Sequence, residues 1–375
     1  MHIEHGVHGG RTIVSEHNGA RIVTTGRHGG YVQRAYVTRG GHSYYSRTYY
    51  DHGHYRSVAY RGYYYGGRNY YGYYPGYYYN PGFYGWAYNP WASPVAWGIG
   101  VGGWGWGGSP WYGFYGGYFA PYPVYPSAAF WLTDYLISAN LQAAYAARQE
   151  AQADASAQAN DGGDQGGGGD APQAANSGPV ALTPEVKQAI AEEVKAQLAA
   201  EKADAAQGGS SGGGQQAAAP ASGEVPAALD PARRTFVVSS DLTVVGGDGQ
   251  ECALTSGDVL TRLTDTPDQD QKVNASVSAS KKTDCASGQQ VAVLVDDLQE
   301  MHNHFQEQLD SGMKTLAAKQ GTGGLPKSPD TGTKPSDIQA PAPDTSASKA
   351  LDDQQKAADQ TESDVSKETA GGGGQ

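Results

Sequence analysis

Histidines gather near the start of the chain at a spacing that could bind a metal ion. Asp51, His52 and His54 lie within four residues, and 8 of the 10 His fall between His2 and His54. Side chains two positions apart on a strand share a face, and imidazole ligands suit zinc or copper. No neighbouring residues complete a ligand set, so we expect turn histidines at the surface. Asp51, His52 and His54 are weak metal candidates, and we predict no cofactor.

Two cysteines, Cys252 and Cys285, are the second group that could do chemistry. Their spacing fits neither a zinc site nor a thioredoxin-type motif. They form either a disulfide or two buried free thiols. A disulfide across this loop would stabilise a small domain by roughly 3–4 kcal/mol, and it would indicate an oxidising, extracytoplasmic compartment.

Arginines alternate with tyrosines between Arg56 and Arg68, a pattern that could stack on single-stranded bases. Residues 1–130 hold 9 Arg and 3 acidic residues and so carry a net charge of +6. Because the net charge of the whole chain is −12, the other 245 residues carry −18. A net charge of +6 over 130 residues is too small to indicate a nucleic-acid binding surface. Cation–π contacts within a sheet account for the same residues, so we do not expect a nucleic-acid partner.

Catalytic signatures are absent from the sequence. Neither a Ser–His–Asp nor a Cys–His arrangement has supporting context, and the glycine runs lack the Lys-Ser/Thr of a phosphate loop. His302 and His304 lie on an expected C-terminal helix, where we expect both in solvent. We therefore predict that the protein is not an enzyme.

The elements that position these residues begin with a β-meander over residues 1–68. Short β-branched and aromatic runs alternate with glycine turns, which predicts antiparallel hairpins. The turn centres are Gly9-Gly10, Asn18-Gly19, Gly29-Gly30, Gly40-Gly41 and His52-Gly53. Neither face of this sheet is strongly apolar, so we expect the following segment or a second copy to cover it.

Residues 69–126 form an uncharged segment rich in Tyr, Trp, Gly and Pro. Its prolines leave at most 15 unbroken residues, Val95 to Ser109, too few for a transmembrane helix, which needs about 20. Contact with a membrane–water interface remains an alternative. The aromatic residues that we expect to self-associate or to adhere to a surface are Tyr63, Tyr64, Tyr65, Trp86, Trp91, Trp97, Trp104, Trp106 and Trp111.

Helices and linkers follow. We predict a helix over 127–158, a flexible linker over 159–181, an amphipathic helix over 182–206 and a linker over 207–231. The 182–206 helix begins at Thr183 as N-cap and carries a narrow apolar stripe every four residues from Val186 to Leu198. That stripe needs a partner, either in a coiled coil or on the chain's own domains.

Residues 232–298 have an apolar period of two, as in Val273, Ala275 and Val277, which predicts half-buried strands. Leu254, Gly257, Asp258 and Leu260 resemble the strand, diverging turn and strand of SH3-type barrels. We expect a small SH3-like barrel with strands near 235–245, 251–255, 258–264, 271–280 and 289–295. It holds Phe236 but no Tyr or Trp, so the peptide-binding role of that family is not carried over.

A helix over 299–319 should follow the barrel, with a stripe from Leu298 to Leu316 that needs burial. We predict that residues 320–375 form a disordered tail. The expected fold class is mostly β, with helices and long disordered linkers.

The N-terminal pattern also resembles uncharacterised bacterial envelope proteins, through Val124-Tyr-Pro-Ser-Ala-Ala-Phe-Trp-Leu-Thr-Asp-Tyr-Leu136 beside a tyrosine-rich region, an acidic helical linker and an SH3-like end. The resemblance implies export and no known activity. The first residues lack a secretory signal, yet strand-like alternation is already under way at Ile3 and Val7, which is unusual for a true N-terminus. We therefore expect a missing upstream segment and an extracytoplasmic location, or otherwise a cytoplasmic one.

The predicted function is that of a non-enzymatic exported envelope or extracellular protein. Its aromatic β module would associate with itself or adhere to the cell-envelope surface. The alternatives are a cell-wall binding module, for glycan or peptide, that acts through the SH3-like domain, and an RNA-associated protein rich in aromatic residues and arginine.

Overall fold

The computed structural model describes residues 1–5, 11–17, 19–25, 29–51, 53–96, 108–161, 181–207, 225–282 and 284–371. Strands make up 31% of the structure and helices 38%, so the fold is mixed rather than mostly β. The chain forms two compact units. Most of the two predicted linkers, residues 162–180 and 208–224, lies outside the described residues.

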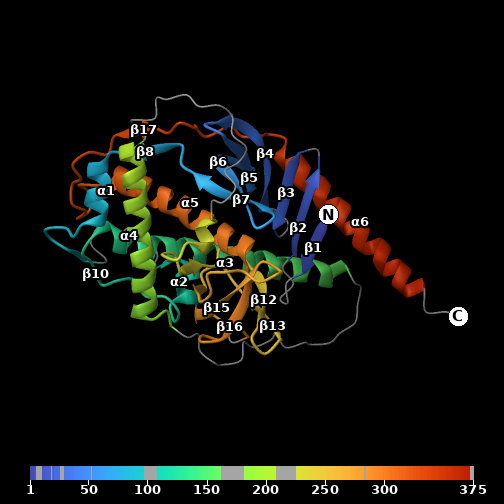
Figure 1. Cartoon of the computed structure of the whole chain (residues 1–375). Coiled ribbons are helices and arrows are strands. Elements are labelled where there is room, and N and C mark those ends of the chain that lie inside the picture. The colour runs from blue at the N-terminus through green and yellow to red at the C-terminus, as the bar shows by residue number, and fades with distance from the viewer. Residues whose placement is uncertain are drawn as a thin grey trace. The chain divides into compact units, whose positions relative to one another are not determined.

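The first unit contains Met1–Tyr78 and the C-terminal residues from Pro335 onward. Its centre is a seven-stranded antiparallel sheet in which the strands follow chain order (Figure 1). The strands are β1 (His2–His5), β2 (Arg11–His17), β3 (Ala20–Thr25), β4 (Gly29–Arg39), β5 (His42–Asp51), β6 (His54–Tyr65) and β7 (Arg68–Tyr74). The predicted meander is therefore confirmed as an antiparallel sheet, and it extends one strand into the uncharged segment.

Glycine turns set the register of this sheet. Gly40 and Gly41 both have positive φ, 59° and 80°, and join β4 to β5 in the backbone twist that tight hairpins need. Gly29 and Gly30, expected at a turn, are instead the first residues of β4. Residues 26–28, between β3 and β4, lie outside the described part of the chain.

One face of the sheet is lined with tyrosine around a buried arginine. Arg47 is fully buried, with its Cζ 4.0 Å from the Tyr31 ring centroid and 3.8 Å from that of Tyr60. Its Nε donates to Gln33 Oε1 at 3.0 Å. Aromatic rings and an amide oxygen thus solvate the guanidinium, as the cation–π interpretation of the Arg–Tyr pattern requires.

The sheet curls. Tyr71 on β7 lies close enough to Arg21 on β3 and Glu16 on β2 for their charges to act on its pKa, which burial raises. Three strands separate β7 from β3 in the sheet order, so a flat sheet would hold these residues far apart. The right-handed twist of successive strands accounts for the curl.

The opposite face is covered by the C-terminal segment, not by the uncharged segment or a second copy. Helix α6 (Ala347–Gly371) packs across β2 to β5, and Ala347 and Leu351 form a cluster with Ala20 and Val32 (Figure 1). Arg11 pairs with Asp359 on α6. The prediction of a disordered tail over 320–375 was wrong for these residues, because a narrow stripe of small apolar side chains suffices once a sheet lies beneath it.

The second unit, Tyr79–Gly209 with Ala227–Lys334, contains most of the helices. Its helices are α1 (Pro81–Tyr88), α2 (Pro110–Tyr115), α3 (Ala128–Asp161), α4 (Pro184–Gln207) and α5 (Val295–Lys319). The short elements of the chain are β8 (Tyr77–Tyr79), β9 (Val95–Ala96), β10 (Val124–Tyr125), a 3-10 turn (Ala227–Leu229) and β17 (Thr333–Pro335). None of the helices in the described part of the chain has the length and apolar character needed to cross a membrane.

Helix α4 packs against α1 and α3, so its apolar stripe is covered by the chain's own unit. Ile190, Val194 and Leu198 are buried, and the Val186 amide donates to Thr183 Oγ1 at 3.4 Å, as expected for an N-cap. Helix α5 also buries its predicted stripe. The prediction for His302 was wrong: this side chain is buried, and burial together with the charge of Arg233 lowers its pKa to about 3.

A six-stranded antiparallel sheet completes the second unit, in the order β11-β14-β15-β16-β12-β13. The strands are β11 (Thr235–Val237), β12 (Leu242–Gly246), β13 (Glu251–Leu254), β14 (Val259–Arg262), β15 (Lys272–Ala279) and β16 (Gln290–Leu294). The expected strand over 235–245 is split into β11 and β12. Between them, the Val238 amide donates to the Asp258 carbonyl and the Gly257 amide donates to the Val238 carbonyl, each at 2.8 Å. A disulfide joins Cys252 on β13 to Cys285, which confirms the first of the two alternatives.

Candidate functional site

The predicted metal candidates do not form a site in the described part of the chain. His54 is exposed, and His52 and the Asp51 side chain lie outside the described residues. Among the residues that the structure describes, no group of three or more His, Cys, Asp or Glu side chains could hold a metal ion.

The nine aromatic residues that we expected to self-associate or to adhere to a surface differ in how exposed they are. Trp97, Trp104 and Trp106 lie outside the described residues. Tyr64 is 45% exposed, whereas Trp91 and Trp111 are core residues at 8% and 7%. Tyr63, Tyr65 and Trp86 are half-buried. Of the tryptophans in the set, Trp86 and Trp91 are brought together, 5.2 Å apart between ring centroids.

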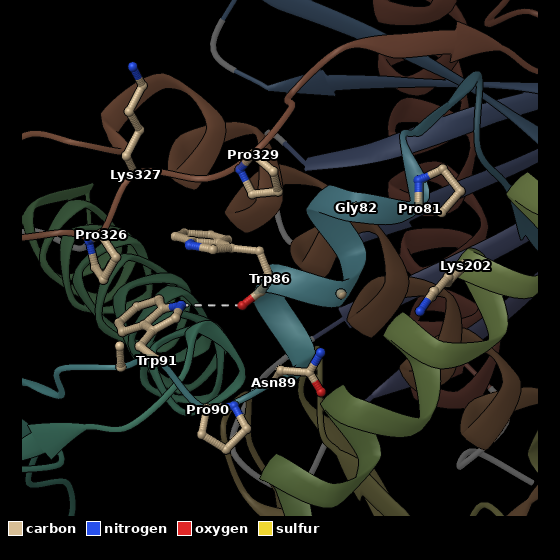
Figure 2. Close-up of a pocket in the computed structure, with 12 residues that line it drawn as sticks. Pro81, Gly82, Trp86, Asn89, Pro90, Trp91, Lys202, Pro326, Lys327 and Pro329 are labelled. Atoms are coloured by element: carbon tan, nitrogen blue, oxygen red, sulfur yellow. Dashed lines mark hydrogen bonds between the residues drawn. The ribbon is translucent and has the colours of Figure 1, made fainter.

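These two indoles form one wall of a groove of about 540 Å³ in the second unit (Figure 2). The groove is built from α1, the turn after it, one residue of α4 and a segment after α5. This segment, residues 325–332, has no regular secondary structure, and we call it the strap. The lining residues are Pro81, Gly82, Gly85, Trp86, Asn89, Pro90, Trp91, Ala92, Lys202, Pro326, Lys327 and Pro329.

Local sequence sets the shape of α1. Pro81 occupies the first turn, where its fixed φ suits a helix start and its missing N–H is not needed. The helix ends at Tyr88. The amide of the C-cap residue Asn89 donates to the Gly85 carbonyl at 2.9 Å, and Pro90 stops the helix from continuing. This short helix thus presents Trp86 at the groove, with Asn89 just after its end.

The indoles are held in place by stacking. Trp86 stacks on Phe83 with a centroid distance of 5.4 Å and an interplanar angle of 14°. Trp91 Nε1 donates to the Trp86 carbonyl at 3.2 Å (Figure 2). Trp86 Nε1 is itself buried, and it has no hydrogen-bond partner among the described residues. A buried indole N–H usually has a partner, so this donor is an exception in the packing around α1.

The strap is fastened to the rest of the unit by hydrogen bonds. The Asn80 amide donates to the Gly332 carbonyl at 3.0 Å, and the Ser328 amide donates to Gln320 Oε1 at 3.1 Å. Leu325 and Ser328 are buried. Lys202 and Lys327 are exposed lining residues. The Lys202 ammonium group lies beside Gly85, whereas the Lys327 side chain runs away from the two indoles (Figure 2). None of the described lining residues is acidic.

A buried carboxyl group adjoins the groove residue Lys202 in the sequence. Glu201 precedes Lys202 on α4, hydrogen-bonds the hydroxyl of Tyr84 on α1 and accepts from Gln197 Nε2 at 3.3 Å. Burial raises the pKa of Glu201 to about 7, and the nearby charge of Asp310 acts in the same direction. Burial also raises the pKa of Tyr84. At neutral pH the contact between α1 and α4 therefore contains a carboxyl group that is partly protonated.

Comparison with known proteins adds no relative. No protein-family model, curated protein or solved structure matches this chain.

The sequence identified Trp86 and Trp91 but missed Lys202, Lys327 and Asn89. The two lysines are 125 residues apart, and neither lies near the tryptophans in sequence. The available signal was the recurrence of proline, at Pro81 and Pro90 around the tryptophans and again at Pro326 and Pro329. Prolines favour rigid, extended walls, but only the fold shows that these two sets face one groove.

Proposed function

We propose that this chain is a non-enzymatic, extracytoplasmic protein that binds a polymer of the cell envelope through the groove beside Trp86 and Trp91. The observation that carries the proposal is the groove itself. It offers half-buried indole surface beside prolines and bare glycine backbone, with the ammonium group of the exposed Lys202 next to Gly85. Concave sites of mixed apolar surface and few polar groups are the usual form of a ligand site.

The disulfide supports the proposed compartment. Disulfides persist in oxidising environments and are rare in the cytosol, and Cys252 and Cys285 are joined. The resemblance of residues 124–136 to bacterial envelope proteins points the same way. Within this stretch, Tyr125, Trp131 and Leu132 are buried, so its role in the proposal is to build the scaffold.

We also propose that the six-stranded sheet is a variant of an SH3-like barrel that serves as scaffold. The turn between β13 and β14 supports this relationship: Gly257 has a φ of 94°, and Asp258 Oδ2 accepts from the Thr255 amide at 2.7 Å. The proposed ligand groove lies on α1, α4 and the strap, and no residue of this sheet lines it.

Self-association through the first unit is a second candidate. Tyr36 lies at a register shift in β4, between Ala35 and Val37. Tyr36 and Val37 are 45% and 39% exposed, and Tyr64 on β6 is 45% exposed. These side chains are apolar surface at which a second copy could pack. The larger tyrosine face contributes less, because Tyr31, Tyr60 and Tyr70 are already buried.

The test of the proposed function uses the purified full chain and an insoluble envelope fraction from the source cells. We expect the chain to sediment with that fraction and the variant Gly85→Met, which fills the groove, to stay in solution. Thiol trapping in intact cells should find Cys252 and Cys285 oxidised. If the chain stays in solution with every envelope fraction, or if its cysteines are reduced in cells, the proposal is wrong.

A further inference from the structure

A lysine on α4 and an aspartate on α3 meet inside the second unit, away from the groove. The Lys187 and Asp134 side chains are 6% and 1% exposed, and Lys187 Nζ lies 2.6 Å from Asp134 Oδ1. This contact lacks the direction of a hydrogen bond, since Oδ1 has no hydrogen-bond partner among the described residues. The two groups therefore touch without the hydrogen bond that normally stabilises a buried ion pair.

Aromatic rings exclude water from this contact. Lys187 Nζ lies 3.7 Å from the centroid of the Tyr122 ring and 5.2 Å from that of Phe119. Burial outweighs the mutual attraction of the two groups, so it raises the pKa of Asp134 and lowers that of Lys187. Both shifts favour the uncharged acid and the uncharged amine, which are the forms that can react with each other.

The second oxygen of the carboxyl group is held by two donors. Asp134 Oδ2 accepts from the Tyr122 amide at 2.6 Å and from the Tyr125 hydroxyl at 2.9 Å. Such donors stabilise the negative charge that develops on an oxygen when its carbon is attacked. Lys187 Nζ is positioned as well, because it donates to the Ala120 carbonyl at 2.7 Å. An amine and a carboxyl group are thus fixed in contact, with donors where charge would develop.

We propose that Lys187 and Asp134 condense in the folded chain to form an intramolecular amide, an isopeptide bond. A proton first passes from the Lys187 ammonium to Asp134 Oδ1. The amine lone pair then attacks Cγ, and negative charge develops on Oδ2. A second amine proton passes to Oδ1, which leaves as water while the carbonyl at Oδ2 forms again. One C–N bond forms and one C–O bond breaks, with neither oxidation nor reduction.

The ion pair and the amide are successive states of the same two groups. The freshly folded chain holds the ion pair, and the amide accumulates as the folded chain ages. The packed rings favour the amide once it has formed, because its hydrolysis needs a water molecule at Cγ. The bond joins α3 to α4 covalently, so that unfolding no longer separates these two helices.

A second buried lysine–aspartate pair provides an internal comparison. Lys281 Nζ also lies 2.6 Å from a carboxylate oxygen, Asp258 Oδ1, but there it donates a regular hydrogen bond. Backbone amides donate to both oxygens of Asp258, from Lys281 at 2.9 Å and from Thr255 at 2.7 Å. Hydrogen bonds of this kind stabilise the charged carboxylate, so this pair should remain ionic.

The experiment follows the intact mass of the full chain after refolding, by mass spectrometry under denaturing conditions with the disulfide reduced. We expect the folded chain to lose the mass of one water with time, and chain kept in denaturant to retain its full mass. Tryptic mapping should find a branched peptide that joins Lys187 to Asp134, since trypsin does not cleave after an acylated lysine. A folded chain that keeps its full mass overturns the proposal.

Three variants separate this reaction from other losses of water. Lys187→Arg keeps the positive charge, but its guanidinium stays protonated and cannot attack, so this variant should lose no water. Lys202→Arg, at an exposed position on the same helix, is the matched control and should react as the wild-type chain does. Tyr125→Phe removes one donor to Oδ2 and should slow the loss of water about a hundredfold.

The remaining outcomes are equally decisive. An aspartate that precedes a glycine, as in Asp248-Gly249, can also lose water by forming a succinimide. Loss of water that persists in Lys187→Arg therefore comes from another reaction and overturns the proposal, as does a branched peptide that joins only Lys281 to Asp258. If Lys187→Arg does not fold, the wild-type map decides: a branched peptide at Lys187 supports the amide, and its absence overturns it.

Discussion

The Lys187 ammonium lies 2.6 Å from the Asp134 carboxylate, and both side chains are almost completely buried. The pair joins α4 to α3. Asp134 also accepts from the Tyr122 amide at 2.6 Å and from the Tyr125 hydroxyl at 2.9 Å, while Lys187 donates to the Ala120 carbonyl at 2.7 Å. Burial raises the pKa of Asp134 and lowers that of Lys187, and the contact between the two groups opposes both shifts.

Asp134→Asn should therefore destabilise the second unit by about 3–5 kcal/mol, since it leaves the Lys187 charge buried without its partner. All 7 Trp lie between Trp86 and Trp131, inside this unit, so denaturant unfolding followed by tryptophan fluorescence measures the loss. The double variant Asp134→Asn with Lys187→Met is the control, because the unpaired charge is then absent. A double variant no more stable than Asp134→Asn would contradict the role of the ion pair.

The carboxyl group of Glu201 predicts a pH dependence. Its pKa is about 7 in the folded chain against 4.5 for an ordinary glutamate, so the folded state binds more protons between those values. Stability of the second unit should then fall as pH rises from 4.5 to 7, and the loss should be complete above the folded pKa. Ionised Glu201 would also face the negative charge of Asp310.

Glu201→Gln should remove this dependence and raise the melting temperature at pH 8 by a few degrees, since about 1 kcal/mol moves the midpoint of a domain this size by roughly 2–4 °C. Glu192→Gln, at an exposed position on the same helix, is the control. Melting curves from pH 4 to pH 9 give the measurement. An unchanged pH profile in Glu201→Gln would exclude this carboxyl group as its source.

The disulfide between Cys252 and Cys285 should stabilise the second unit by about 3–4 kcal/mol, the chain-entropy estimate for a sequence separation of 33. Cys252→Ala with Cys285→Ala should lower the denaturation midpoint accordingly. A reducing agent should have the same effect on the wild-type chain and none on the double variant. If the reducing agent also lowers the denaturation midpoint of the double variant, its effect on the wild-type chain does not come from this disulfide.

Leu351 should be the side chain that holds α6 on the N-terminal sheet. It is 5% exposed and packs with Ala20 and Val32, so Leu351→Ala should cost the first unit about 2–4 kcal/mol. Hydrogen exchange of β2 to β5 gives the readout, because the first unit contains no tryptophan. The exposed Val365 on the same helix provides the control Val365→Ala. Equal exchange in both variants would contradict the docking of α6.

Much of the secondary structure could be predicted from local patterns. Paired glycines and alternating residues indicated the N-terminal hairpins, the spacing of Val273, Ala275 and Val277 indicated β15, and Thr183 marked the start of α4. These features depend on backbone conformation and on the period of burial, which neighbouring residues determine. Because Cys252 and Cys285 are the only cysteines, the sequence identified the one possible intramolecular disulfide, but it left two buried free thiols as the alternative.

Other features depend on residues far apart in the chain. The helix over 347–371 has too little apolar surface to be distinguished from a disordered tail until the sheet supplies its partner. His302 on α5 is buried near Arg233, which is 69 residues away in the sequence, so its burial depends on tertiary packing. Likewise, Trp86, Lys202 and Lys327 become one groove through the packing of α1, α4 and the strap. Composition and period determined which residues could form strands, helices and aromatic surface, whereas tertiary packing decided which of those surfaces were covered and which remained open to a ligand.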